Sequence, residues 1–273
     1  MGIDAFRYDG ERVLVVGGAT GMGAAAAKTA GELGAEVIVL DVAEVSFPTA
    51  QSIKVDLRDR DDVDAALTQV EAPIHAVFSC AGVADGTPGI MLINFISQRY
   101  IIEQLRGDGR LGRGGAVAMI SSVAGLGWNR NLPTVLDFLA QPDWAAAAKW
   151  IEEHEGTDSY GFSKQAINTY VAHDAFPMLR TGIRINAILP GPTDTPLARA
   201  NADLWLTFGA DYRDAAGVDM LVPEQMGNVL AFLCCDAASG ITGVTVLVDA
   251  GHVSSGLTGS FEAPIIKMIL GVE

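Results

Sequence analysis

Short apolar runs rich in β-branched residues alternate with longer helical stretches along the chain, and this alternation restricts the fold more than any other feature. Strands that alternate with helices form repeated βαβ units around a parallel sheet. The runs at 13–16 and 37–40 are apolar at every position, as expected of strands covered on both faces. The sequence therefore predicts an α/β fold, with one doubly wound parallel sheet of about seven strands.

The expected elements follow from this alternation. We find no short repeat, low-complexity tract or interdomain linker, so residues 1–273 are expected to form a single domain. Strands are expected at 12–16, 36–40, 52–55, 74–79, 116–121, 184–189 and 244–248, and helices at 21–34, 61–70, 91–105, 158–179 and 223–235.

Composition excludes several classes of protein. The net charge of −15 would repel a phosphate backbone, which argues against nucleic-acid binding. No apolar run reaches the roughly 18 residues that span a bilayer, and the first nine residues lack the layout of a signal peptide. Three cysteines and four scattered histidines suggest neither a disulfide framework nor a metal site. We expect a cytoplasmic protein without a metal.

A glycine-rich turn follows the first expected strand. Such a turn lets a diphosphate approach the backbone, and the next helix offers free N–H groups and its positive dipole end. Taken alone this signal is weak, because many glycine-rich turns bind nothing. The residues expected to contact a dinucleotide here are Gly17, Ala19, Thr20, Gly21, Met22 and Gly23.

Asp41 ends the second strand, 18 residues after Gly23. A carboxylate there can accept hydrogen bonds from both adenosine ribose hydroxyls but would repel a 2′-phosphate. No Arg or Lys lies in the glycine turn or in 42–46, so the sequence predicts NAD rather than NADP. The alternative is a plain strand-end aspartate. Asp56 can bind the adenine amine or simply form a turn, and Val42 and Leu57 are expected beside the adenosine.

Tyr160 and Lys164 stand four residues apart in an expected helix, and therefore on one face. The ammonium can lower the pKa of the phenol and hold the nicotinamide ribose. An unassisted Tyr, with a pKa near ~10, is a poor base at neutral pH. Because this spacing is common, a surface pair is the alternative.

Two further segments lie at expected strand ends, where ligands bind in open α/β sheets. Ser121 and Ser122 end the fifth strand, and a Pro-Gly loop at 190–195 follows the sixth. The glycine turn, strand-end serine, Tyr/Lys helix and Pro-Gly loop, in this order, resemble the short-chain dehydrogenase/reductase family. The resemblance runs from about residue 12 to residue 251.

The resemblance implies a role for each matching position. Ser122 would hydrogen-bond the substrate oxygen, Tyr160 would transfer the proton and Lys164 would bind the ribose. Asn94 would hold a water that links the lysine to solvent. The cofactor would also contact Cys80, Ala81 and Gly82 after the fourth strand, and Pro190, Gly191, Thr193 and Thr195 in the Pro-Gly loop. Asp249, Ala250 and Gly251 resemble the family's terminal Asp-Gly-Gly.

Two features depart from the family pattern. Cys80 stands where the family has Asn, and a thiol is a weaker hydrogen-bonding group than an amide. The 37 residues between Ser122 and Tyr160 are far more than usual. This insertion, about 128–156, is expected to form two helices broken near 141–142, with Pro142 at a first helical position and Gly156 as a stop. It loosely resembles that of the bacterial 3α-hydroxysteroid dehydrogenase/carbonyl reductase subgroup.

The four tryptophans lie in two segments, with Trp128, Trp144 and Trp150 in the insertion and Trp205 after the Pro-Gly loop. If they border a cleft, they favour a bulky hydrophobic alcohol or ketone, such as a steroid-like or cyclic compound. Alternatively they pack the insertion onto the body or form a subunit contact. The apolar tail at 261–272 is expected to dock on its own subunit or a neighbour. We expect a homo-oligomer, a tetramer or a dimer.

The sequence thus favours an oxidoreductase that transfers a hydride between NAD(H) and a secondary alcohol or ketone. Two alternatives remain open: a catalytically silent NAD-binding sensor or scaffold, and a β-ketoacyl thioester reductase. A mere binder has no physical need for Ser122, Tyr160 and Lys164 together. A thioester reductase typically uses NADP and basic patches, for which the sequence offers little support.

Overall fold

The computed structural model describes residues 2–272 and contains one seven-stranded, all-parallel sheet in the order β3-β2-β1-β4-β5-β6-β7. The predicted α/β fold is confirmed. The strand order reverses between β1 and β4, and in such sheets a crevice for ligands opens at the carboxyl ends of the two strands. The strands are β1 (Arg12–Val16), β2 (Glu36–Asp41), β3 (Gln51–Lys54), β4 (Ile74–Ser79), β5 (Leu111–Ile120), β6 (Arg184–Pro190) and β7 (Thr245–Val248).

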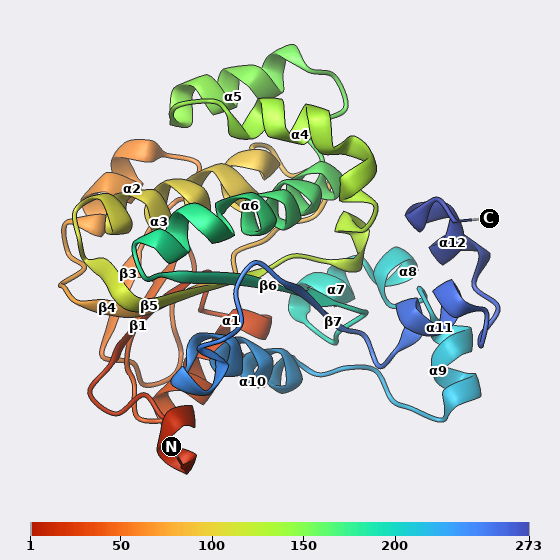
Figure 1. Cartoon of the computed structure of the whole chain (residues 1–273), viewed down its shortest axis with the longest axis horizontal. Coiled ribbons are helices and arrows are strands. Elements are labelled where there is room, and N and C mark those ends of the chain that lie inside the picture. Colours follow the sequence, from red (N-terminus) through yellow and green to blue (C-terminus); the bar gives the residue numbers. More distant parts are fainter. Residues whose placement is uncertain (1, 273) are drawn as a thin grey trace.

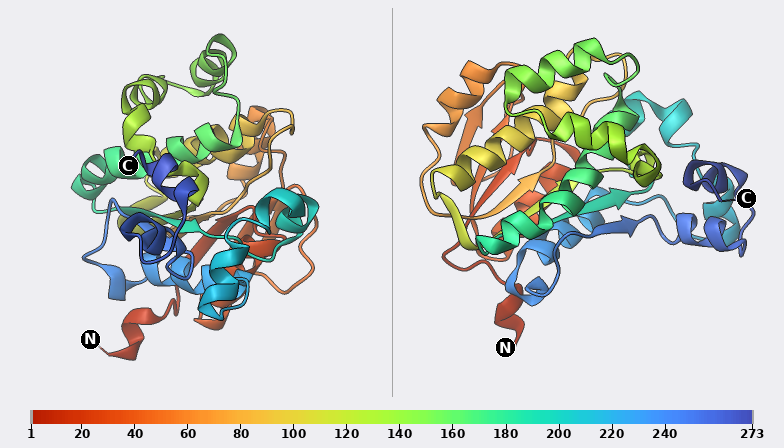
Figure 2. Two further views of the ribbon diagram at one scale, coloured as in Figure 1. Left: turned by 90° about the vertical axis from the view of Figure 1, so that its right-hand side faces the viewer. Right: turned by 45° about the horizontal axis from the view of Figure 1, so that its top comes forward.

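Helices cover both faces of the sheet (Figure 1). α1 (Gly21–Glu32) and α10 (Pro223–Cys234) lie together on one face, and α2 (Arg60–Leu67), α3 (Ser97–Gly107) and α6 (Tyr160–Arg180) lie on the other. Beyond the carboxyl ends of β6 and β7, a group of short helices forms the right-hand part of Figure 1 and the near side of the left view in Figure 2. They are α7 (Pro196–Ala200), α8 (Ala202–Trp205), α9 (Ala210–Ala216), α11 (His252–Thr258) and α12 (Pro264–Leu270).

Each face of the sheet has its own hydrophobic core. Leu14 and Val16 belong to the core under α3 and α6, whereas Val13 and Val15 belong to the core under α1 and α10. Because successive strand residues point to opposite faces, a strand covered on both sides must be apolar at every position. This is the physical reason for the continuous apolar run in β1.

The insertion forms a helical hairpin, as predicted, made of α4 (Leu132–Leu139) and α5 (Trp144–Glu153). The hairpin lies on the outer side of α6, at the top of Figure 1. Pro142 is not the first helical residue, which corrects the sequence expectation. Asp143 caps the helix instead, since its carboxylate accepts a hydrogen bond from the Ala146 N–H at 2.9 Å.

Other boundaries move by a few residues for local reasons. β5 begins at Leu111 rather than 116, because Leu111 pairs with Ile74 before the register shifts. α3 is preceded by a π-helical turn, η2 (Leu92–Ile96), and α6 begins at Tyr160 because Ser159 caps it. The remaining short turns of helix are η1 (Ile3–Phe6), η3 (Val123–Gly125), η4 (Trp128–Asn131) and η5 (Asp236–Ala238). Within residues 2–272, every helix is too short or too polar to cross a membrane.

Candidate active site

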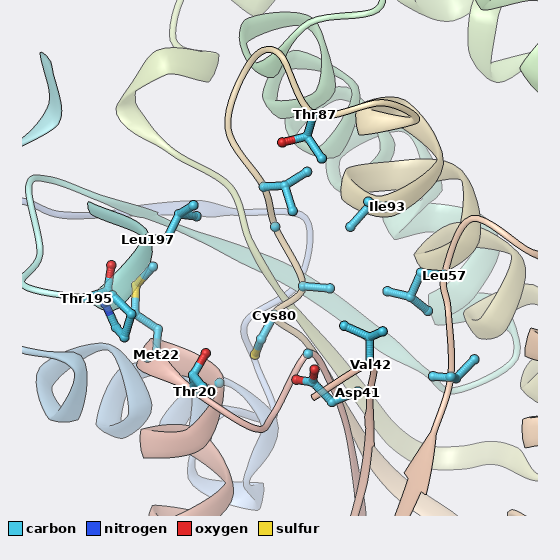
Figure 3. Close-up of a pocket in the computed structure, with 18 of the residues that line it drawn as sticks. Thr20, Met22, Asp41, Val42, Leu57, Cys80, Thr87, Ile93, Thr195 and Leu197 are labelled. Carbon is cyan, nitrogen blue, oxygen red and sulfur yellow. The ribbon is translucent and has the colours of Figure 1, made fainter. Parts of the chain in front are cut away.

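Two adjoining cavities lie at the carboxyl edge of the sheet. The first, which we call the glycine cavity, opens between β1, β2 and β4 and is shown in Figure 3. The second, the tyrosine cavity, has a volume of about 390 Å³ and opens between the ends of β5 and β6 and the start of α6. Both are lined by Met22, Cys80, Gly82, Thr195 and Leu197, so they form one continuous groove.

The glycines of the first turn are required by close approach of the backbone. Gly17 has a φ of +80°, and a side chain there would overlap the backbone of Ala81. A side chain on Gly23 would overlap the carbonyl oxygen of Gly17. The glycines therefore allow close backbone packing between β1 and α1, and Gly17, Gly21 and Gly23 line the glycine cavity.

Asp41 lies at the end of β2 and lines the same cavity (Figure 3). Its Oδ2 accepts a hydrogen bond from the Ala19 N–H at 2.8 Å, and its Oδ1 accepts one from the Ala43 N–H at 2.9 Å. Two backbone donors thus fix the carboxylate at the mouth of the cavity. Ala19 binds the Asp41 carboxylate but does not line the cavity, whereas Thr20, Met22 and Val42 do line it.

Asp56 and Leu57 line the cavity, and the Asp56 carboxylate is paired within the chain. Arg58 donates to both of its carboxylate oxygens, at 2.9 Å from Nε to Oδ1 and 2.6 Å from Nη2 to Oδ2. These bonds lower the pKa of Asp56. Arg58 also lines the cavity, and sequence reasoning missed it because it lies outside the glycine turn and the 42–46 segment that follows β2.

Ser122, Tyr160 and Lys164 all line the tyrosine cavity. Ser122 comes from the segment after β5, and Tyr160 and Lys164 come from α6. The Lys164 Nζ lies 5.3 Å from the centre of the Tyr160 ring and donates a hydrogen bond to the Ile120 carbonyl at 2.9 Å. Ser122 lies two residues after the end of β5, and its Oγ accepts from the Ala124 N–H at 3.1 Å. The strand-end serine and the Tyr/Lys pair, which are two separate sequence motifs, therefore share one cavity.

Burial dominates the electrostatics of these residues. It lowers the pKa of Lys164 to about 8, since the side chain is only 2% exposed. Burial also raises the pKa of Tyr160; proximity to the Ser122 hydroxyl lowers it, and the nearby Asp85 carboxylate raises it. The net effect is a raised pKa of the phenol, because loss of hydration is the largest influence on it.

Asn94 is fully buried in the π-helical turn η2. Its Oδ1 accepts from the Val83 N–H at 2.8 Å, and its Nδ2 donates to the Val83 carbonyl at 3.1 Å and to Ser163 Oγ at 3.2 Å. A side chain on Gly82 would lie 3.8 Å from Lys164 Nζ and 3.9 Å from Asn94 Oδ1. Gly82 thus leaves free space between these two polar groups.

The Pro-Gly loop closes the groove from the side of β6. A side chain on Gly191 would come within 3.0 Å of the Asp249 backbone, so glycine is needed there. Thr193 donates to the Gly191 carbonyl at 2.9 Å, and Thr195 caps α7 by accepting from the Ala198 N–H at 3.0 Å. Pro190, Gly191, Thr193 and Thr195 all line the tyrosine cavity.

Cys80, Ala81 and Gly82 follow β4 and line the glycine cavity. Cys80 lies where the two cavities meet, in the centre of Figure 3. Loss of hydration raises the pKa of its thiol far above the usual range. Cys80 is therefore a neutral thiol at physiological pH, in keeping with the expectation that it is not a nucleophile.

The tryptophans do not border both sides of a cleft, which corrects that part of the sequence interpretation. Trp144 and Trp150 are buried, and Trp150 packs on Phe138 and Phe162 with ring centres 5.2 and 5.9 Å away. They attach the insertion to the body, which was the alternative interpretation. Trp205 lines the tyrosine cavity, and its ring centre lies 4.9 Å from that of Tyr160.

Sequence reasoning missed several residues of the tyrosine cavity. Asp85 lies in the loop after β4, and its Oδ1 accepts a hydrogen bond from the Tyr160 N–H at 2.7 Å. Ile269 reaches the cavity from α12, so the apolar tail docks on the chain itself as one alternative expected. Leu197 and Phe208 complete the apolar wall. Only the apolar character of the tail hinted at any of these contacts.

Comparison with known proteins places this architecture among relatives. A family model described as "NAD dependent epimerase/dehydratase family" matches residues 13–173, and one described as "Enoyl-(Acyl carrier protein) reductase" matches residues 145–253. The cis-4-hydroxycyclohexanecarboxylate dehydrogenase of Sinomonas cyclohexanicum is 30% identical, over 89% of this chain and 97% of that protein. The 3-alpha-hydroxysteroid dehydrogenase/carbonyl reductase of Comamonas testosteroni is 28% identical, over 88% and 95%.

A solved structure shares the fold. The 3-alpha-hydroxysteroid dehydrogenase from Pseudomonas sp. B-0831, complexed with NADH, superposes with a TM-score of 0.71 at 22% identity, over 93% of this chain and all of that one. The sheet order, the glycine-lined crevice and these relatives agree with the resemblance noted in the sequence. The chain belongs to the short-chain dehydrogenase/reductase family of oxidoreductases.

Proposed function

We propose that this protein is an NAD-dependent dehydrogenase that interconverts a secondary alcohol and a ketone on a bulky hydrophobic frame. One observation carries the proposal. Ser122, Tyr160 and Lys164 share an apolar-walled cavity that continues directly into the glycine cavity bordered by Asp41. The reacting group and the dinucleotide would therefore lie end to end in one groove.

The glycine cavity fits a dinucleotide by its shape and its charge. Its floor lacks side chains at Gly17, Gly21 and Gly23, so a diphosphate can lie against the start of α1. Asp41 keeps both oxygens at the cavity edge, where it would accept hydrogen bonds from ribose hydroxyls and repel a 2′-phosphate. Arg58 does not offset this charge freely, because Asp56 already holds its guanidinium.

The nicotinamide supplies the chemistry of hydride transfer when the cofactor is bound. The chain's own residues handle the proton and the orientation of the substrate. Tyr160 Oη would give a proton to the ketone oxygen or take one from the alcohol, and Ser122 Oγ would donate a hydrogen bond to the same oxygen. Lys164, whose pKa is near 8, can exchange a proton in the working range of the enzyme. The space left by Gly82 would admit a water between Lys164 and Asn94.

The walls of the tyrosine cavity support a hydrophobic substrate. Leu197, Trp205, Phe208 and Ile269 line it, and its volume lies within the range of pockets that bind drug-sized molecules. Two relatives support a ring system, because their names specify a hydroxycyclohexanecarboxylate and a hydroxysteroid, although the first of these substrates carries a carboxylate. The proposal of a hydrophobic substrate is therefore based on Trp205 and its apolar neighbours in the cavity, and not on the buried tryptophans.

The test is the change in NADH absorbance with a panel of secondary alcohols at alkaline pH. Cyclic hydrophobic alcohols should be oxidised with higher kcat/KM than short polar ones, and with NAD in preference to NADP. Tyr160→Phe should lower kcat by several orders of magnitude and leave NAD binding little changed, because the hydroxyl acts mainly in the transition state. Tyr100→Phe, whose hydroxyl bonds Asp64 on α2, is the matched control.

Other outcomes would contradict the proposal in distinct ways. NAD binding without turnover of any alcohol would indicate a silent sensor. Preference for NADPH and a β-ketoacyl thioester would indicate the thioester reductase. Asp41→Ala combined with Val42→Arg should shift preference toward NADP, and unchanged selectivity would refute the assigned ribose contact.

A further inference from the structure

The charges around the tyrosine cavity are few and unequal. Among the described residues that line it, Asp85 and Lys164 alone carry a formal charge. Lys164 is buried and donates to the Ile120 carbonyl, whereas Asp85 is exposed at the mouth. The charge that an incoming substrate meets first is therefore negative.

The start of α6 is the place where an anionic substrate would ordinarily find donors, because the first N–H groups of a helix lack partners within it. Here the protein fills two of these positions itself. The Tyr160 N–H donates to Asp85 Oδ1 at 2.7 Å, and the Phe162 N–H donates to Ser159 Oγ at 3.3 Å. A substrate carboxylate beside Tyr160 would therefore meet the like charge of Asp85 where the first N–H of the helix is already occupied.

We propose that Asp85 determines specificity by excluding anionic substrates, so that the enzyme acts on alcohols and ketones without a carboxylate or phosphate. The inference rests on the proposed function, since it concerns the substrate of the same cavity. The bond to the Tyr160 N–H fixes one carboxylate oxygen and leaves the negative charge at the cavity mouth. Asp85 is a specificity residue and takes no part in moving the proton.

The size of the effect follows from Coulomb's law. If the Asp85 carboxylate and a charged group on the substrate lie about 8 Å apart, at an effective dielectric constant of about 20 to 40, their interaction changes the binding equilibrium of the substrate by roughly tenfold. The test uses three matched cyclohexanols that carry at C4 a carboxylate, its methyl ester or an ammonium group. The wild-type protein should oxidise the ester with about tenfold higher kcat/KM than the acid, and the amine at least as well as the ester.

Asp85→Asn removes the charge and keeps an oxygen that can accept from the Tyr160 N–H. The variant should raise the acid-to-ester ratio of kcat/KM by about tenfold and lower the amine-to-ester ratio by a similar factor. It should also lower the kinetic pKa of the catalytic base, because Asp85 raises the pKa of Tyr160. A merely structural role would not produce opposite shifts for acid and amine. Asp158→Asn makes the same change of charge two residues before Tyr160, at an exposed site that does not line the cavity, and should alter neither ratio.

The result separates this inference from the proposed function. If the ester is oxidised but Asp85→Asn leaves both ratios unchanged, or if the wild-type protein prefers the acid, the charge filter is refuted and the function stands. If none of the three compounds is oxidised, their binding to the NAD-loaded protein is measured by calorimetry instead. If none is oxidised but the binding ratios still shift in Asp85→Asn, the proposed function fails and the charge filter stands.

Discussion

Replacing Lys164 with Met should stabilise the protein near neutral pH, although it should abolish activity. Burial lowers the pKa of this ammonium from 10.5 to about 8, so carrying the charge inside costs the folded state about 3 kcal/mol. Met fills similar space without a charge. It also leaves the Ile120 carbonyl without its 2.9 Å donor, which costs about 1 kcal/mol. The net gain at pH 7 is about 2 kcal/mol, or a rise in Tm of about 5 °C for a chain of this size.

The pH dependence gives this prediction its sign. Below pH 8 both folded and unfolded wild-type chains hold the proton, so the penalty is fully present. Between pH 8 and 10.5 the folded chain releases its proton while the unfolded chain keeps it, so wild-type stability rises with pH. At pH 9.5 the penalty has fallen to about 1 kcal/mol, and the two proteins should be about equally stable.

Urea denaturation without added cofactor at pH 7 and pH 9.5 measures both differences. Lys149→Met is the control, because that lysine is 71% exposed and its pairing with Glu153 is a surface ion pair. It should change the free energy of unfolding by no more than about 0.5 kcal/mol at either pH. The reasoning is refuted if Lys164→Met is less stable than the wild type at pH 7, or if the difference between them is the same at both pH values.

Three further predictions concern stability and the substrate cavity. Ala250 has a φ of +56°, so Ala250→Gly should relieve strain and stabilise the protein by about 1 kcal/mol in thermal unfolding, whereas the exposed helical Ala145→Gly should destabilise it by about as much. Ile269→Ala should lower kcat/KM for a bulky cyclic alcohol by about tenfold, and Met268→Ala, 69% exposed and outside the cavity, should not. Trp150→Ala should cost about 3 to 5 kcal/mol in urea denaturation, and a loss below about 1 kcal/mol would contradict its place in the core.

The local sequence was enough to predict the strands, the helices that cover the sheet and their order, but not the short helices that follow β6 and β7. Apolar runs such as that of β1 specify strands covered on both faces, and glycines at 17 and 23 specify a turn that packs backbone against backbone. The spacing of Tyr160 and Lys164 depends on helical geometry alone, so it could be interpreted without the fold. The two helices of the insertion were predictable for the same reason.

The tertiary structure decided everything that depends on which distant residues meet. Trp150 and Trp205 look alike in the sequence, yet one packs in the core and the other lines the cavity. Asp85 reaches the N–H of Tyr160, 75 residues away, and no local pattern encodes such a contact. The pKa of Tyr160 likewise depends on burial, which is a property of the assembled site and not of the residues beside it in the chain. The sequence by itself determined which reactive groups this protein carries. The packing decided the pKa values of those groups and which side chains line the cavity around them.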